Sequence, residues 1–345
     1  MAPTKNGRLI FKSVPKGYPV PGETTVYDTE EIDLDTLALN GGVLVKALYL
    51  SVDPYLRGRM REATAKSYSG AFALNKPISG FGVGRVLRSE KEGVKEGDNV
   101  WVPELPFQQY SVLSAKHPVM VIKNEANVPL SAYLSVLGMP GKTAYYALEI
   151  IGQPKAGETI YVSTGAGPVG STVSQLAKSA GLKVIASAGS DDKVEYLRSI
   201  GVDVAFNYKK TKIADVLDQE GPIDIYWDNV GGESLEAAIN ACRDFARIIV
   251  CGAISAYNGG EPYGIKNTMQ IVTKRLTVRG FIQHELETQV GKPRVFYEKM
   301  TPLVASGQIK WNEQIYEGLE KAGDAILDVQ KGDNTAKAVV KVADA

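Results

Sequence analysis

Histidine and cysteine are scarce in this sequence, which has two of each among 345 residues. Catalytic zinc in enzymes needs a set of Cys and His ligands, and structural zinc takes four clustered ones. The two cysteines, Cys242 and Cys251, belong to no C-x-x-C pair. We therefore expect no metal site and no disulfide framework. Cys242 lies on a predicted helix and Cys251 ends a predicted strand, so packing is the expected role of each thiol.

Net charge and long apolar runs are also missing. Lys plus Arg and Asp plus Glu each total 39, so no bulk field favours nucleic acid or an anionic membrane surface. No segment approaches the roughly 20 apolar residues of a membrane-spanning helix, and residues 1–5 lack an apolar signal region. We expect a cytoplasmic protein that binds neither nucleic acid nor membrane.

A glycine-rich turn follows a short β-branched run at Thr159–Ser163. The turn, Gly165–Gly170, has the form G-x-G-x-x-G, and apolar residues then recur at helical spacing before a second strand-like run at Lys183–Ser187. In such a βαβ unit the glycines let the backbone approach a pyrophosphate, and the helix N-terminus offers free N–H groups. The pattern predicts a dinucleotide site, and a purely structural glycine turn is the alternative.

The residues after the second strand favour NADPH over NADH. An NAD site usually has an Asp or Glu about 20 residues past the first glycine, to hold the ribose 2′-hydroxyl. Ser187–Ser190 has no acid at that place. Lys193 follows on the first turn of the next predicted helix, where its ammonium can reach a 2′-phosphate. A solvated helix lysine is the alternative interpretation of Lys193.

The length and the pattern of the chain indicate two domains. Up to about residue 125, short apolar runs separated by Gly and Pro are typical of a small, partly open β-barrel. Beyond about residue 130, strand and helix signals alternate as far as a possible sixth strand at Leu276–Ile282, which predicts a Rossmann-type, doubly wound parallel sheet. We therefore predict an α/β protein with a barrel domain of residues 1–128 and 307–345, a dinucleotide-binding domain of residues 129–306, and an active site in the cleft between them.

Four sequence words resemble those of one family. They are Ser51–Gly58 (SVDPYLRG), Gly138–Tyr145 (GMPGKTAY), Asp228–Gly232 (DNVGG) and Cys251–Asn258 (CGAISAYN). Over essentially its whole length the chain resembles the zinc-independent medium-chain dehydrogenase/reductases, and within them the branch of prostaglandin and leukotriene reductases and plant alkenal double-bond reductases. The resemblance implies a GroES-like barrel domain. Two residues depart from the family pattern. Lys142 stands where the family usually has an apolar residue, and Pro168 stands where it usually has a small one. The proline should be harmless, because proline is accepted in the first turn of a helix.

The chemistry implied by the resemblance is NADPH-dependent reduction of the carbon–carbon double bond of an enal or enone. Hydride delivered to the β-carbon leaves negative charge on the carbonyl oxygen, and without a metal a hydroxyl donor must stabilise that charge. Tyr257 follows the end of the predicted fifth strand, where ligands sit in open α/β sheets. We predict Tyr257 as the donor and Tyr55 as a substrate contact, with the nicotinamide ribose hydroxyl as a rival donor.

The resemblance also implies a set of cofactor contacts. Gly167, Pro168, Val169 and Gly170 would face the pyrophosphate. Lys193 and Tyr208 would hold the adenosine phosphate end. The remaining implied contacts are Thr143, Asn229, Cys251, Gly252, Ala253, Ile254, Ser255, Tyr257, Phe281, Ile282 and Asn334. For Asn229 and Asn334, turn chemistry is the alternative role.

Two other functions fit the same pattern. One is a quinone reductase of the same superfamily, and the other is a non-catalytic protein that binds the cofactor for a structural purpose. A sixth strand at the edge of the sheet would invite pairing with a symmetry mate. We therefore also predict a homodimer.

Overall fold

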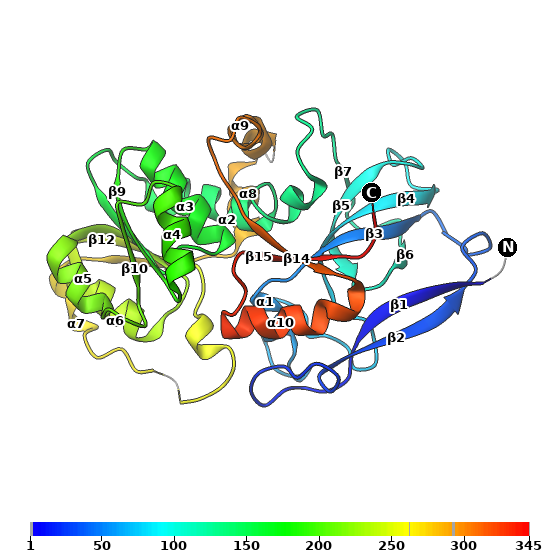
Figure 1. Ribbon diagram of the computed structural model, residues 1–345, viewed down its shortest axis with the longest axis horizontal. Helices are drawn as coiled ribbons and strands as arrows, with labels where there is room; N and C mark the ends of the chain where they lie inside the picture. The colour runs from blue at the N-terminus through cyan, green and yellow to red at the C-terminus, as the bar shows by residue number, and fades with distance from the viewer. Residues whose placement is uncertain (1–2, 262, 292–293, 345) are drawn as a thin grey trace. The chain divides into compact units, whose positions relative to one another are not determined.

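The computed structural model describes residues 3–261, 263–291 and 294–344. The chain forms two compact units, Met1–Leu134 together with Glu313–Ala345, and Ser135–Asn312 (Figure 1). Both junctions lie six residues beyond the boundaries expected from the sequence (128 against 134, and 306 against 312). The first difference arises because the largely buried 3-10 turn η1 (Leu130–Leu134) packs on strands β3 (Val43–Ser51) and β4 (Ser79–Ser89) of the first unit.

The first unit is built on two sheets of mainly antiparallel strands. Strands β1 (Thr4–Phe11) and β2 (Thr25–Ile32) form an antiparallel pair. The larger sheet has the order β14-β15-β3-β4-β5-β7, and β6 also pairs with β3. Its strands are β3 (Val43–Ser51), β4 (Ser79–Ser89), β5 (Asn99–Pro106), β6 (Tyr110–Leu113), β7 (Met120–Val121), β14 (Glu313–Glu317) and β15 (Lys337–Lys341).

The C-terminal segment joins this larger sheet. β15 pairs antiparallel with β3, with Val339 opposite Ser51, and in parallel with β14. Two helices, α1 (Tyr55–Arg59) and α10 (Ala322–Lys331), complete the unit. One apolar cluster fills it, with side chains such as Phe11, Leu50 and Ile326 almost wholly buried. Segments from both ends of the chain therefore share one core.

The second unit is a six-stranded parallel sheet with the order β10-β9-β8-β11-β12-β13. Its strands are β8 (Thr159–Val162), β9 (Lys183–Ala188), β10 (Val204–Asn207), β11 (Ile223–Asp228), β12 (Cys242–Val250) and β13 (Thr277–Gly280). This order reads 3-2-1-4-5-6 in strand sequence, which is the doubly wound arrangement of dinucleotide-binding sheets. The predicted fold class, a Rossmann-type sheet with a separate antiparallel sheet unit, is confirmed.

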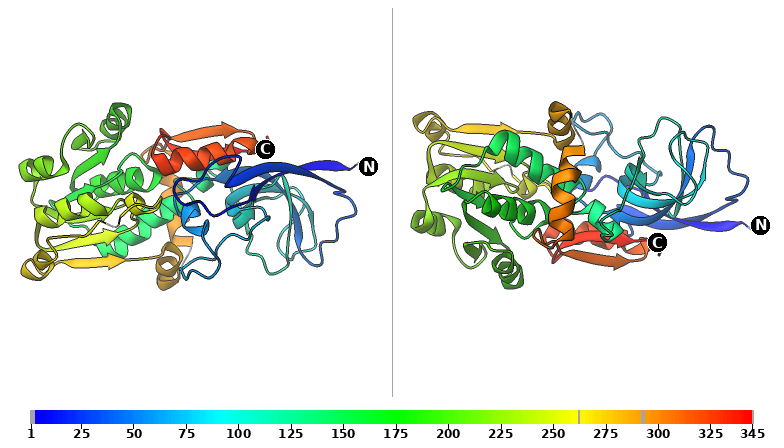
Figure 2. Two further views of the ribbon diagram at one scale, coloured as in Figure 1. Left: turned by 90° about the horizontal axis from the view of Figure 1, so that it is seen from below. Right: turned by 90° about the horizontal axis from the view of Figure 1, so that it is seen from above.

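Helices cover both faces of the parallel sheet (Figure 2). The α-helices described in this unit are α2 (Met139–Ala147), α3 (Pro168–Ser179), α4 (Asp191–Ser199), α5 (Ile213–Glu220), α6 (Gly232–Ala241), α7 (Met269–Thr273), α8 (Gln283–Val290) and α9 (Arg294–Ala305). Of these, α3 packs on β8 and β9, α4 on β9 and β10, and α6 on β11, whereas α8 packs on α2. Because the inner strands are covered on both sides, they read as near-continuous apolar runs. Tyr226 and Trp227 at the centre of the sheet are fully buried.

Two features of the second unit differ from the sequence-based expectation. Cys242 was expected on a helix, but α6 ends at Ala241 and Cys242 begins β12, where it pairs with Ile223. A buried apolar residue fits the end of a helix and the start of a strand equally well, so periodicity does not separate them. Helix α8 was not expected, because Leu286 is its one buried residue and the apolar stripe is missing.

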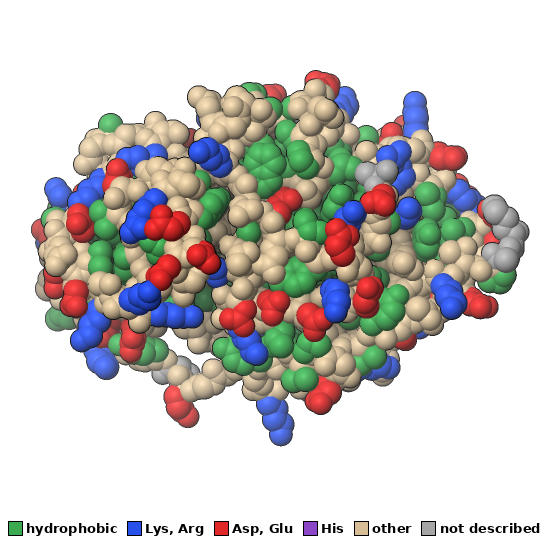
Figure 3. Space-filling view, in the orientation of Figure 1, with side chains coloured by type: hydrophobic (Ala, Val, Ile, Leu, Met, Phe, Trp, Pro, Cys, Tyr) green, Lys and Arg blue, Asp and Glu red, His purple; other side chains and the backbone are tan. Residues whose placement is uncertain are grey.

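The surface agrees with the balanced composition. On the face shown in Figure 3, basic and acidic side chains are interspersed, as the equal totals of 39 lead us to expect. No helix in the described ranges combines the length and the apolar character needed to cross a membrane.

Candidate functional site

The glycine-rich turn lies where the parallel sheet reverses its winding direction. β8 pairs with β9 on one side, with Val162 opposite Ala186, and with β11 on the other, with Val162 opposite Trp227. The turn after β8 is tied to β9, because the Gly165 N–H donates to the Ser187 carbonyl at 2.8 Å. Ligands of open α/β sheets bind outside the carboxyl ends of the strands at such a switch point.

The three glycines of this turn have different surroundings. A Cβ atom on Gly170 would lie 2.6 Å from the Thr164 carbonyl oxygen, and one on Gly165 would lie 2.7 Å from the Ala186 Cβ, so both positions are closed to a side chain by protein packing. A Cβ on Gly167 would meet no protein atom closer than 3.4 Å. The backbone of Gly167 is therefore open to a ligand rather than packed against the protein.

Helix α3 begins directly after this open glycine. Gly167 is its N-cap and Pro168 its first residue, where the missing N–H of proline costs no helical hydrogen bond. Gly167, Pro168 and Val169 are half-buried. The start of a helix leaves N–H groups and a partial positive charge for an anion. The turn thus fits a pyrophosphate in both shape and polarity.

Lys193 and Tyr208 flank the loop after β9. Lys193 is half-buried on the first turn of α4, and Tyr208 follows β10. The Tyr208 ring lies over Gly189, since a Cβ on that glycine would be 3.0 Å from the Tyr208 hydroxyl. Asn207 and Lys210 both donate hydrogen bonds to the Asp191 carboxylate. These bonds lower the pKa of Asp191, and the bond from Lys210 has the larger effect. Asn207, which ends β10, and Lys210, which follows it, therefore hold the Asp191 carboxylate.

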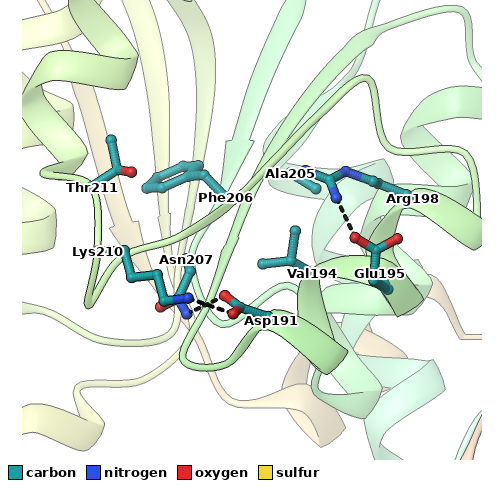
Figure 4. Close-up of a pocket in the computed structure, with 9 residues that line it drawn as sticks. All are labelled: Asp191, Val194, Glu195, Arg198, Ala205, Phe206, Asn207, Lys210 and Thr211. Carbon is teal, nitrogen blue, oxygen red and sulfur yellow. Dashed lines mark hydrogen bonds and ion pairs between the residues drawn. The ribbon is translucent and has the colours of Figure 1, made fainter.

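A shallow pocket of about 270 Å³ opens on α4, β10 and the turn that follows β10 (Figure 4). Its acids are paired within it, Asp191 with Lys210 and Glu195 with Arg198. None of the residues predicted to contact cofactor or substrate lines this pocket. We therefore place the candidate site at the switch point rather than here.

Asn229 connects the ends of two strands at the switch point. Its Nδ2 donates to the Ser163 carbonyl at 2.7 Å, and its Oδ1 accepts the Trp227 indole N–H at 3.1 Å. Its backbone N–H donates to the Ser163 hydroxyl at 3.0 Å. These bonds give Asn229 a structural role across β8 and β11. Its predicted contact with the cofactor stays a prediction.

Tyr257 follows a short 3-10 turn, η3 (Ile254–Ala256), in the loop after β12. The side chain is half-buried. Its hydroxyl turns back over the loop, where the Ala253 N–H donates to it at 3.4 Å and a Cβ on Gly252 would lie 3.1 Å away. The hydroxyl is thus held in the loop that follows β12, and its role as hydrogen-bond donor to the substrate stays a prediction.

Three more predicted contacts lie at this edge of the sheet. Phe281 and Ile282 follow β13, and the Phe281 ring packs edge-on against Trp227 of β11, with centroids 6.1 Å apart. Cys251 follows β12, and burial raises the pKa of its thiol to about 12. At neutral pH the thiol is therefore protonated and a poor nucleophile.

Thr143 and Lys142 lie on α2. Thr143 is buried, and its hydroxyl donates to the Met139 carbonyl one turn earlier at 2.7 Å. Lys142 is also buried, and its Nζ lies 2.7 Å from Glu287 Oε1 on α8. Gln283 donates to the other oxygen of Glu287 at 2.9 Å. The departure at Lys142 is thus matched by an acidic partner that fastens α8 to α2.

In the first unit, Tyr55 begins α1 and packs edge-on against Phe81, with centroids 6.0 Å apart. Burial raises the pKa of the Tyr55 hydroxyl well above its usual range, and the nearby Asp53 carboxylate raises it further. Tyr55 is therefore a neutral donor at neutral pH. Asn334 lies in the turn between α10 and β15, where its Nδ2 donates to the Ala336 carbonyl at 2.7 Å, as turn chemistry predicts.

Sequence reasoning missed a buried ion pair beside Tyr55. Lys337 Nζ lies 3.3 Å from Asp53 Oδ1, and both side chains are almost wholly buried. The same ammonium donates to the Val52 carbonyl at 2.7 Å, and the Ser51 hydroxyl donates to Asp53 Oδ2 at 2.5 Å. These contacts hold the segment that precedes Tyr55 against β15. No local pattern marks a pair separated by so many residues.

Across residues 3–261, 263–291 and 294–344, no three His, Cys, Asp or Glu side chains gather in a way that could hold a metal ion. The expectation that the protein works without a metal stays a prediction.

The fold is that of a dinucleotide-binding protein, and the comparisons with known proteins identify the chain as an NADP-dependent oxidoreductase. A family model described as "N-terminal domain of oxidoreductase" matches residues 8–121, and one described as "Zinc-binding dehydrogenase" matches residues 168–305. The chain belongs to the medium-chain dehydrogenase/reductase family. The predicted family resemblance and the predicted cofactor, NADPH, are confirmed.

Three relatives illustrate the similarity. The chain is 41% identical to "NADP-dependent oxidoreductase RED1" of Cochliobolus heterostrophus, over 99% of this chain and 98% of the relative. It is 38% identical to "2-alkenal reductase (NADP(+)-dependent)" of Nicotiana tabacum, over 98% and 97%. Among solved structures, CurA from Vibrio vulnificus in complex with NADPH is similar with a TM-score of 0.87 and 32% identity, over 98% of this chain and 100% of that one.

Proposed function

We propose that this protein reduces the carbon–carbon double bond of α,β-unsaturated aldehydes and ketones, with NADPH as the hydride donor. The observation that carries the proposal is the 38% identity, over 98% of the chain, to a relative named for the reduction of 2-alkenals. A 2-alkenal is an aldehyde whose double bond is conjugated to the carbonyl. The location of Tyr257 at the carboxyl end of β12 supports the same chemistry.

In this mechanism the protein stabilises the charge that develops on the substrate. When bound, NADPH would supply a hydride to the β-carbon of the substrate, negative charge would accumulate on the carbonyl oxygen, and uptake of a proton at the α-carbon would complete the saturated product. The Tyr257 hydroxyl donates a hydrogen bond to that oxygen, which is stronger for the enolate than for the neutral carbonyl. The ribose hydroxyl of the cofactor is the rival donor. Tyr55, kept neutral by its burial, is proposed as a substrate contact.

The cofactor contacts proposed here follow the geometry of the second unit. The open backbone at Gly167 and the start of α3 would receive the pyrophosphate. Lys193 would pair with the 2′-phosphate, beside the Tyr208 ring over Gly189. Asn229, the loop Cys251–Tyr257 and Phe281–Ile282 lie at the ends of β11, β12 and β13, where the ribose and nicotinamide would follow.

The substrate class is tested by NADPH consumption with purified protein. We expect turnover with a 2-alkenal and with an enone, with the saturated carbonyl compound as product, and none with the corresponding saturated aldehyde. Turnover of ortho- or para-quinones without turnover of alkenals would instead support a quinone reductase. NADPH binding without turnover of any of these compounds would support a structural, cofactor-binding role.

The role of Tyr257 is tested by Tyr257→Phe, which removes the hydroxyl and keeps the ring. Loss of one oxyanion donor typically costs about 10²–10³ in rate, but the ribose hydroxyl shares this task, so we expect kcat to fall roughly tenfold or more with little change in NADPH affinity. Tyr27→Phe, an exposed tyrosine on β2, is the matched control and should keep wild-type kcat. An unchanged kcat with a raised KM would make Tyr257 a pocket residue.

We also propose that the protein is a homodimer joined along β13. This strand is at the edge of the parallel sheet, and all four of its residues are exposed. A cytoplasmic location stays a prediction.

A further inference from the structure

A chain of buried hydroxyl groups lies beside the parallel sheet, beneath the switch point. Tyr226 of β11 donates to Asp228 Oδ1 at 2.8 Å, and its oxygen lies 2.8 Å from the Ser234 hydroxyl of α6. Tyr226 stacks on Tyr161 of β8, with ring centroids 5.1 Å apart and planes 11° from parallel. The Tyr161 hydroxyl lies 3.0 Å from the Ser187 hydroxyl and 3.5 Å from the Ser234 hydroxyl, and it makes no direct hydrogen bond to Asp228 among the described contacts. The two phenols are thus alike in burial but differ in their contact with Asp228.

The carboxyl group of Asp228 organises the turn that follows β11. Its Oδ1 accepts the Val230 N–H at 3.0 Å and the Gly231 N–H at 2.8 Å, in addition to the Tyr226 hydroxyl. Gly231 has φ of +71°, in the region that favours glycine. Asp228 has no exposed surface, so water does not compete for these bonds. One carboxyl oxygen therefore sets the course of the backbone from residue 228 to 231.

The turn of residues 228–231 holds the loop of residues 251–257. The backbone carbonyl groups of residues 228–230 accept five hydrogen bonds from this loop. They are Cys251 N to Asp228 O at 2.8 Å, Gly252 N to Asp228 O at 3.1 Å, Ile254 N to Asn229 O at 3.3 Å, Ser255 N to Val230 O at 3.2 Å and Ser255 Oγ to Val230 O at 2.6 Å. The loop therefore takes its position from the turn. Tyr257 is attached to the loop both by the chain and by the bond from the Ala253 N–H.

We propose that Asp228, held in place by the Tyr226 hydroxyl, is a positioning residue that fixes the loop 251–257 and thereby the Tyr257 hydroxyl. The catalytic part of this inference rests on the proposed role of Tyr257. Asp228 does not touch the substrate in this account. It acts through the turn, because a displaced carboxyl would release the Val230 and Gly231 N–H groups and move the carbonyls on which the loop rests.

The positional part is tested by hydrogen exchange of the backbone amides of residues 251–255, without reference to catalysis. Tyr226→Phe and Asp228→Ala should speed this exchange about ten- to hundredfold, because each removes a buried hydrogen bond at the Asp228 carboxyl group. Tyr161→Phe is the matched control, because it removes a phenol of the same burial that does not contact Asp228. It should leave exchange at these amides unchanged. Equal acceleration in both Phe variants, or none in either, overturns the proposal.

Ser255→Ala provides a variant outside the core, since Ser255 is exposed. It removes the 2.6 Å bond from Ser255 to the Val230 carbonyl. It should speed exchange in the same loop by a smaller factor, and this measurement stands even where a buried variant does not fold. Unchanged exchange in Ser255→Ala contradicts the idea that the turn holds the loop.

The catalytic part is tested by a double-mutant cycle. Tyr226→Phe should lower kcat severalfold in the wild-type background and less than about twofold when Tyr257 is already Phe, because coupled residues are non-additive. An equal loss in both backgrounds shows that Tyr226 and Asp228 do not act through Tyr257. If Tyr257→Phe alone keeps wild-type kcat, the proposed enolate donor is wrong, and the exchange measurements still decide whether Asp228 positions the loop.

Discussion

The glycine turn allows binding and stability to be separated with two single substitutions. Gly167→Ala adds a methyl group that meets no protein atom closer than 3.4 Å, at a backbone conformation (φ −69°, ψ 165°) that any residue adopts. A Gly→Ala change at a compatible site stabilises by about 0.4–1 kcal/mol, while alanine is a poorer N-cap than glycine. We therefore expect the free energy of unfolding to change by no more than about 1 kcal/mol.

The same methyl group should obstruct the cofactor. If the pyrophosphate lies against the Gly167 backbone, the methyl displaces it and at least one hydrogen bond to a charged oxygen is lost. Such a bond contributes about 1.5–3 kcal/mol, which corresponds to a rise of roughly ten- to 150-fold in the Kd for NADPH.

Gly170→Ala is the matched control. Its methyl would lie 2.6 Å from a backbone oxygen and 2.8 Å from the Gly165 Cα, so the backbone itself must shift. Overpacking of this kind costs about 1–3 kcal/mol, which for a unit of this size lowers the Tm by roughly 2–4 °C for each kcal/mol.

Calorimetry of the cofactor-free protein and titration of NADPH monitored by fluorescence measure the two quantities. We expect Gly167→Ala to lose affinity while its Tm stays within roughly 2–4 °C of the wild-type value, and Gly170→Ala to lower the Tm by more than that. Wild-type affinity in Gly167→Ala would refute the placement of the pyrophosphate at this glycine. A large loss of Tm in the same variant would refute the inference that the position is open.

Three further predictions concern other contacts. Lys193→Ala should raise the KM for NADPH by one to two decades, from a charge-assisted bond of about 1.5–3 kcal/mol, and leave the KM for NADH unchanged; equal weakening of both would make Lys193 structural. Lys142→Met should lower the free energy of unfolding in urea by about 1–3 kcal/mol, because it leaves the partly buried Glu287 carboxylate without its lysine partner, whereas Lys142→Met combined with Glu287→Met should be close to neutral; an unchanged free energy in the single variant would contradict a stabilising pair. Light scattering at micromolar concentration should give a dimer mass, and Val278→Lys on the exposed edge strand should shift it to the monomer; a monomeric wild-type protein would exclude the proposed assembly.

The buried ion pairs were not predictable from sequence. Lys142 was recognised as unusual within its sequence word, but its partner Glu287 lies 145 residues away on a helix that has no apolar stripe. The same holds for Lys337 and Asp53, which meet only because β15 returns to β3. A charged residue is exposed by default, so nothing in the local pattern distinguishes these lysines from solvated ones.

The sequence by itself determined the parts that depend on short-range order. Strand, glycine turn, helix and strand at residues 159–188 follow from spacing and backbone freedom within one short segment, and so does the missing acid that points to NADPH. Tyr257 could be placed after a strand for the same reason. Tertiary structure alone decided which glycine of the turn is open to a ligand and which are packed against protein atoms. Gly165, Gly167 and Gly170 are the same residue type, and they differ only in the atoms that β9 and the turn itself bring against them. Tertiary structure also decided that the turn after Asp228 makes hydrogen bonds to the loop of residues 251–257. The order of strands in the sheet, and not their order in the chain, determines which strand ends are neighbours.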